Sequence, residues 1–113
     1  MAFNSDLCGG YDTAEIDNFV DRNDLEQDAC ALTAIPGIDD AEEEALDGSG
    51  INKCTQILGK MLMLNNGARD CQEVCDAMMA WLLECGVGRP EGNKAVYSIA
   101  LHLMQRRYFS YNI

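Results

Sequence analysis

The chain has 113 residues, of which 48% are hydrophobic, so it is sized for one domain with a single modest core and is too apolar for a disordered segment. Its net charge is −11, and a uniformly acidic protein avoids nucleic acids and acidic membranes. The charge is uneven, however. Residues 1–50 hold 14 acids and one base, whereas residues 51–113 hold five acids and seven bases, so an acidic half precedes a nearly balanced half.

The chain begins Met1-Ala2-Phe3-Asn4-Ser5-Asp6, which has neither the basic start nor the apolar run of a secretory signal. No stretch approaches the roughly 20 apolar residues of a membrane span. We therefore expect an intracellular protein whose six cysteines are reduced. We expect residues 1–12 to be a flexible N-terminus and residues 13–113 to form a single helical domain.

Two capping signals mark the first predicted helices. Asp12 followed by Glu15 is typical of a capping box and predicts a helix whose apolar face carries Ile16, Phe19 and Val20. Asn23 with Glu26 repeats the signal, and the apolar spacing then continues through Leu25, Ala29 and Leu32. The sequence therefore predicts two short helices before residue 33.

A tight turn follows in Leu32-Thr33-Ala34-Ile35-Pro36-Gly37-Ile38, where Gly37 permits the turn and the flanking isoleucines pack beneath it. The acidic segment 39–47 is the predicted second helix of this hairpin, with Ala41, Ala45 and Leu46 facing inward and Gly48 and Gly50 ending it. Such helix-hairpin-helix turns present backbone N–H groups to a nucleic-acid phosphate. Here six acids and no base follow the turn, so its surroundings would repel phosphate.

Three further helices are predicted. Segment 53–64 carries a broad apolar stripe made of Cys54, Ile57, Leu58, Met61 and Leu62. After a break at Asn65-Asn66-Gly67, segment 70–85 places apolar residues at spacings of three and four: Cys71, Val74, Cys75, Met78, Trp81, Leu82 and Cys85. Pro90 is expected to delay the last helix, which Asn93 would cap and whose stripe is Val96, Ile99, Ala100, Leu103 and Met104. We predict an all-α fold: a compact bundle of about five short helices containing a helix-hairpin-helix.

The residues predict no enzyme, because the chain holds no nucleophile elbow, P-loop, dinucleotide fingerprint or zincin motif. Cys71 and Cys75 lie one helical turn apart, but His102 is the only histidine and no CxxC spacing exists, so we expect core packing, no metal and no cofactor. His102 is expected to be structural or exposed. Adaptable core or dimer contacts are expected from Met61, Met63, Met78 and Trp81.

In order and spacing, several short motifs resemble the barrier-to-autointegration factor family, which comprises small dimeric, all-helical DNA-bridging proteins of chromatin and the nuclear envelope. They are Phe19-Val20, Gly37-Ile38, Leu46 with Gly50-Ile51-Asn52-Lys53, Ile57-Leu58-Gly59, Leu62-Met63-Leu64, Trp81-Leu82 and Cys85-Gly86. The resemblance runs from about Glu15 onward. It implies a homodimer, a LEM-domain protein as partner, a nuclear or cytoplasmic location and double-stranded DNA at Pro36, Gly37, Ile38 and Asp39.

This chain differs from the family pattern mainly in its charged residues. Asp39 stands in place of the hairpin's second glycine, and the family's basic positions fall on Glu15, Asp17, Glu44 and Ala45. Residues 65–80 form a longer connection, and the terminal tryptophan motif is missing. A helix end supplies only about half a unit charge. Six carboxylates within the Debye length of about 8 Å should overwhelm it, so the resemblance implies weakened DNA binding.

Three functions stay open. The first is a non-enzymatic, dimeric adaptor of the barrier-to-autointegration factor type with a weakened DNA surface. The second is a genuine DNA-bridging protein, in which the hairpin amides are helped by cations from Lys53, Arg69, Lys94, Arg106 and Arg107. The third is an acidic inhibitor or DNA mimic that presents a partner surface to a basic protein, made of Asp39, Asp40, Glu42, Glu43, Glu44 and Asp47.

Overall fold

The apolar stripes of the sequence fold into helices in the computed structural model, which describes residues 3–22, 31–65 and 70–108. Two 3₁₀ helices and five α-helices follow one another in the described residues: η1 Ser5–Gly10, α1 Thr13–Val20, η2 Leu32–Ala34, α2 Asp40–Gly48, α3 Cys54–Leu64, α4 Cys71–Glu84 and α5 Arg89–Gln105. None of the described stretches forms a strand, and the predicted all-α class is confirmed. The predicted first helix of the hairpin lies largely within residues 23–30, which are outside the described ranges.

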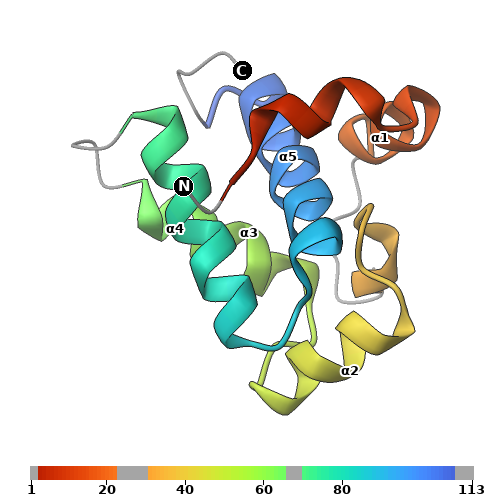
Figure 1. The fold of residues 1–113 in the computed structure, drawn as a ribbon, viewed down its shortest axis with the longest axis vertical. Coiled ribbons are helices and arrows are strands. Elements are labelled where there is room, and N and C mark those ends of the chain that lie inside the picture. Colours follow the sequence, from red (N-terminus) through yellow and green to blue (C-terminus); the bar gives the residue numbers. More distant parts are fainter. Residues whose placement is uncertain (1–2, 23–30, 66–69, 109–113) are drawn as a thin grey trace.

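Helix α5 lies at the centre of the molecule, with α1 on one side and α3 and α4 on the other (Figure 1). Its apolar stripe is buried as predicted at Val96, Ile99, Ala100 and Leu103. Helix α4 contributes Val74, Cys75, Met78, Met79 and Leu82 to the same core. Because α5 contacts the three α-helices α1, α3 and α4, most of its surface is covered. Its buried residues therefore extend beyond the predicted apolar stripe.

Side-chain caps fix two helix starts where the sequence predicts them. The Asp12 carboxylate accepts hydrogen bonds from the amides of Ala14 (3.0 Å) and Glu15 (3.5 Å). The Asp70 carboxylate accepts one from the Glu73 amide at 2.9 Å. These helix starts were therefore predictable from local sequence.

The start of α5 corrects a prediction. Pro90 lies in the first turn of the helix, and Gly88 is the N-cap residue, so the helix begins four residues before Asn93. Proline is tolerated there because its missing N–H would have no intrahelical partner. Asn93 does not cap the helix: its side chain is buried within α5 and binds residues far away in the chain.

Several predicted core positions also differ. Ala41 is exposed on α2, and Leu62 is 36% exposed at the outer face of α3. Cys71, Trp81 and Cys85 are only half-buried, and Met104 is half-buried beside the core. In each case the apolar stripe is wider than the neighbouring helices can cover. Asn23, Leu25, Glu26 and Ala29 lie outside the described residues.

Residues 1–12 were predicted to be a flexible N-terminus, whereas the described part of this segment, residues 3–12, is docked on the helical body. Phe3 is 3% exposed, and its amide donates to Asp76 of α4. The Asn4 amide donates to Asn93 of α5. The described helices are all too short or too polar to cross a lipid bilayer.

Candidate functional site

The turn at residues 35–38, which the sequence predicts to belong to a helix-hairpin-helix, packs against α5. Ile35, Pro36 and Ile38 are buried, and the Ile38 amide donates to the Ile35 carbonyl at 3.0 Å. Gly37 has a φ of +93°, and a Cβ at this position would overlap the carbonyl oxygen of Glu91 and lie 3.1 Å from the amide nitrogen of Ala95. Glycine is therefore required twice here, for the backbone conformation and for the close approach to the first turns of α5.

The amide at the start of α2 already has an anionic partner. Asp39 is the N-cap residue of α2, and its N–H donates to Glu42 Oε1 at 3.0 Å as part of a capping box. In a phosphate-binding hairpin this donor would face the ligand. Here a carboxylate of the chain itself takes that place. The Asp-x-x-Glu spacing of residues 39–42 is a capping-box signal, but this cap was not among those predicted from the sequence.

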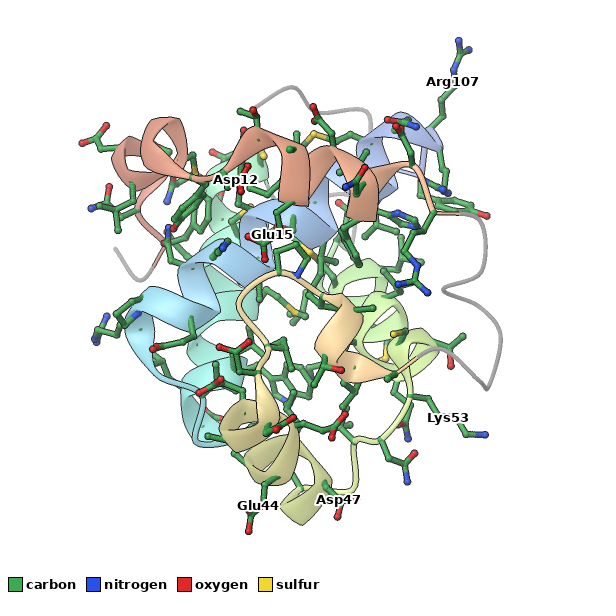
Figure 2. The ribbon with its side chains drawn as sticks, turned by 90° about the vertical axis from the view of Figure 1, so that its right-hand side faces the viewer. Asp12, Glu15, Glu44, Asp47, Lys53 and Arg107 are labelled. Carbon is green, nitrogen blue, oxygen red and sulfur yellow. The ribbon has the colours of Figure 1, made fainter. Side chains whose placement is uncertain are left out.

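We refer to the six acids of the hairpin helix as the acidic surface: Asp39, Asp40, Glu42, Glu43, Glu44 and Asp47. Four of them are exposed, and Glu42 and Glu43 are half-buried. Glu44 and Asp47 point away from the body of the molecule (Figure 2). In the part of the chain that the structure describes, none of the six forms an ion pair. Their charges therefore act outward on whatever approaches α2.

The four positions that align with basic residues of the resembled family offer no cation. Glu15 is exposed and pairs with Lys94 of α5 at 2.7 Å, and Asp17 is exposed two residues further along α1. Glu44 belongs to the acidic surface. Ala45 is half-buried, and its Cβ would lie 3.4 Å from a Cβ on Gly86, so it packs against the end of α4.

The cations that the DNA-bridging hypothesis requires are dispersed. Lys94 is held by Glu15 and lies 6.0 Å from the centre of the Tyr11 ring. Arg106 donates to the backbone carbonyls of Val20, at 2.7 Å, and of Arg22, so it ties α5 to the end of α1. Lys53 and Arg107 are exposed at separate places on the surface (Figure 2). Arg69 lies outside the described residues.

The four residues predicted as core or dimer contacts divide into two groups. Met61 and Met78 are fully buried and belong to the core. Trp81 is half-buried, with the Lys60 ammonium 5.4 Å from its ring centre, a cation–π contact. Met63 is 74% exposed. Of the four, Met63 thus has the most surface available to a second subunit.

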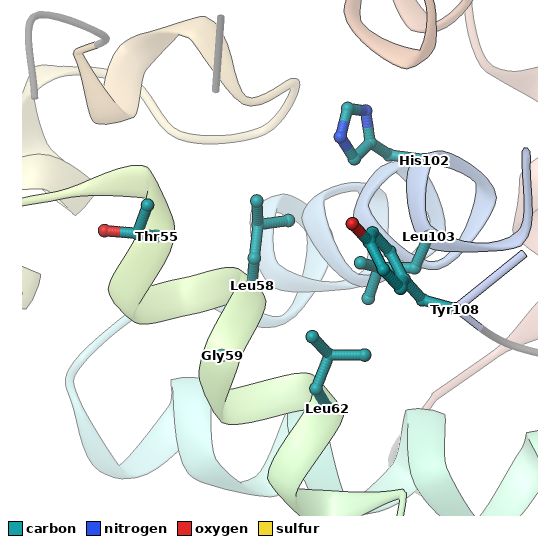
Figure 3. Close-up of a pocket in the computed structure, with 7 residues that line it drawn as sticks. All are labelled: Thr55, Leu58, Gly59, Leu62, His102, Leu103 and Tyr108. Atoms are coloured by element: carbon teal, nitrogen blue, oxygen red, sulfur yellow. The ribbon is translucent and has the colours of Figure 1, made fainter. Parts of the chain in front are cut away.

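An apolar groove lies between α3 and the end of α5 and has a volume of about 460 Å³ (Figure 3). Its described lining consists of Thr55, Leu58, Gly59, Leu62, His102, Leu103 and Tyr108. His102 is 3% exposed, and its ring centre lies 5.4 Å from that of Phe19, so this histidine is structural. The described lining offers apolar contact but no carboxylate or ammonium group.

The cysteines on α4 behave as packing residues. Cys75 is buried, and burial raises the pKa of its thiol well above 9.0. Burial also raises the pKa of the half-buried Cys71. Both thiols are therefore protonated and weakly nucleophilic at neutral pH. Across residues 3–22, 31–65 and 70–108, no group of three or more His, Cys, Asp or Glu side chains is arranged to hold a metal ion.

No family model matches the chain, and searches of curated proteins and of solved structures also return no match. The resemblance to barrier-to-autointegration factor therefore stays a prediction from short motifs.

Proposed function

We propose that this chain is a non-enzymatic adaptor whose acidic surface binds a basic protein, and that its hairpin does not serve as a DNA site. The observation that carries the proposal is the Glu42 carboxylate on the Asp39 amide. The donor that a phosphate would need is already bonded to an anion. A DNA phosphate would have to displace that carboxylate in the field of five further acids.

Electrostatics also disfavour DNA here. Phosphate neutralisation by Lys and Arg supplies nearly all non-specific DNA affinity. The candidate cations Lys94 and Arg106 are engaged within the fold, and Glu15 and Glu44 stand where the resembled family has bases. A duplex that contacts the hairpin would therefore meet repulsion with little compensation.

The same arrangement suits a cationic protein surface. The acidic surface lies on a regular helix of nine residues, Asp40–Gly48, which Leu46 anchors in the core. Exposed charges on a rigid helix attract an oppositely charged partner at long range and orient it on approach. The adaptor role, homodimerisation and a LEM-type partner are what the family resemblance adds to this proposal.

A salt-dependent binding experiment tests the proposal. Fluorescence anisotropy would be measured with two labelled probes, a lysine- and arginine-rich peptide and a short DNA duplex, at low and physiological salt. We expect salt-sensitive binding of the basic peptide and no submicromolar binding of the duplex. Submicromolar duplex binding with a steep salt slope would contradict the proposal and favour the DNA-bridging function.

A pair of charge-matched variants locates the binding surface. Glu44→Lys with Asp47→Lys reverses two exposed charges of α2, and Asp6→Lys with Asp17→Lys reverses two exposed charges elsewhere. Both variants have a net charge of −7 instead of −11. We expect the α2 variant to bind the basic peptide about tenfold more weakly, a loss of about 1.4 kcal/mol, and the control to lose much less. Equal losses would show that only the net charge matters.

A further inference from the structure

The first described residues form an arm, residues 3–10, that lies against the helical body and contacts α5 through η1. Phe3 is 3% exposed and belongs to the core cluster. By contrast, η1 has no buried residue, and Leu7 is 49% exposed. In Figure 1 the arm runs from beside α4 across α5 towards α1. Cys8 is half-buried against the core, so Phe3 is the more deeply buried of the two side chains that hold the arm.

Side chains of α4 bind both backbone groups of Phe3. Its amide donates to Asp76 Oδ1 at 2.8 Å, and its carbonyl accepts from Gln72 Nε2 at 3.0 Å. Gln72 Nε2 also donates to Asp76 Oδ1 at 3.0 Å. The carboxylate and the amide therefore hold one another in the orientation that the Phe3 backbone requires.

Asn93 of α5 does the same for the next residue. Its Oδ1 accepts from the Asn4 amide at 2.7 Å, and its Nδ2 donates to the Asn4 carbonyl at 3.0 Å. The same nitrogen lies 2.8 Å from the Tyr11 hydroxyl oxygen. Asn93 is 3% exposed, so its side-chain amide is a buried polar group that the arm satisfies.

These contacts are those of a bound peptide. Extended peptides are held by hydrogen bonds to their main chain, which supply affinity, and by side-chain pockets, which supply specificity. Here two helices bind the N–H and C=O groups of two consecutive residues, and one aromatic side chain is buried in the core. At the other end of the arm, Cβ atoms added to Gly9 and Gly10 would meet nothing within 4 Å. Two unconstrained glycines are suited to act as a hinge.

We propose that the cleft between α4 and α5 is a binding site for an extended peptide of aromatic–asparagine sequence. The chain's own Phe3-Asn4 fills the cleft in this structure, and the same segment of a second copy can replace it. The second copy is the occupant because its arm offers the same anchor and the same main-chain groups. Exchange of an identical element between protomers requires Phe3 and Cys8 to leave the core and the chain to open at the glycine pair.

Peptide binding in trans tests the cleft on the full chain. A labelled decapeptide with the sequence of residues 1–10 would be titrated by anisotropy into the unmodified protein and into the Phe3→Ala variant, which lacks the anchor of its own arm. A tethered arm competes at an effective concentration in the millimolar range, so we expect at least about tenfold tighter binding to Phe3→Ala. The Leu7→Ala variant, altered at an exposed arm position, should bind like the unmodified protein.

The proposal is overturned if Phe3→Ala is folded by circular dichroism and binds the decapeptide no more tightly than the unmodified protein. It is also overturned if a decapeptide with alanine in place of phenylalanine binds equally well. Mixing Phe3→Ala with Asn93→Ala tests the second copy as donor. The first variant keeps a working cleft and the second keeps a working arm, so light scattering should detect a dimer in the mixture and neither variant alone should form it.

Hydrogen exchange on the unmodified chain gives a result even if the variants do not fold. We expect the Phe3 and Asn4 amides to exchange about 100-fold faster than the core amides of α4, because the arm opens without global unfolding. Exchange at the same rate as the core amides would show that the arm is not separable, and the proposal would fall.

Discussion

Replacing Gly37 by alanine tests the close contact between the hairpin turn and α5. The substitution has two costs. A φ of +93° is strained for any residue with a Cβ, at about 1–2 kcal/mol. The added Cβ would also overlap the Glu91 carbonyl oxygen and approach the Ala95 amide at 3.1 Å. These are backbone atoms of a helix, so they cannot rotate away, and overpacking of this kind costs roughly 1–3 kcal/mol.

Gly50→Ala provides the matched control, because Gly50 also has a positive φ, +83°, and a Cβ there would meet nothing within 4 Å. We expect Gly50→Ala to lose about 1–2 kcal/mol of unfolding free energy and Gly37→Ala about 2–5 kcal/mol. A domain of this size has a stability of roughly 10 kcal/mol, so both variants should fold.

Thermal and urea denaturation followed by circular dichroism would measure the difference. At about 4 °C per kcal/mol, the melting temperature should fall by about 4–8 °C for Gly50→Ala and by about 8–20 °C for Gly37→Ala. Equal losses for the two variants would refute the reasoning, because only the contact with Glu91 and Ala95 distinguishes the two sites.

Two further predictions concern the Asp39 amide, which the Glu42 carboxylate binds, and the buried Cys75 thiol. One variant removes four of the six carboxylates of the acidic surface by combining Asp39→Gly, Glu42→Gln, Glu43→Lys and Glu44→Lys. It should gain salt-sensitive duplex binding in an anisotropy titration, and unchanged affinity would rule out a latent phosphate site. Because burial raises the pKa of the Cys75 thiol above 9.0, the unfolded chain releases this proton at lower pH than the folded chain does. The thiol's contribution to stability is therefore complete below about pH 9 and is lost progressively above it. Urea denaturation from pH 8 to 10.5 should show a decline in the free energy of unfolding that is smaller in Cys75→Ala than in the unmodified protein. An equal decline in both proteins would contradict this prediction.

The sequence by itself determined the helices, because their signals are local. The period of apolar residues and the cap at Asp12 act within a few positions of each other, and the structure confirms them. The structure adds a cap at Asp70, the predicted start of segment 70–85. The glycine at position 37 was also readable as a turn. Its requirement for the contact with Glu91 was not, because that carbonyl lies more than 50 residues away in the chain.

Only the tertiary structure decided which polar residues are buried and which apolar ones are exposed. Asn93 was predicted as a cap because its residue type favours helix starts, yet the Asn4 backbone satisfies it inside the fold. Met61 and Met63 are two residues apart in the sequence, but Met61 is fully buried and Met63 is 74% exposed. Helical periodicity defines an apolar face, whereas burial depends on which distant segments pack against that face. For the same reason the docked arm at Phe3 could be recognised only after folding.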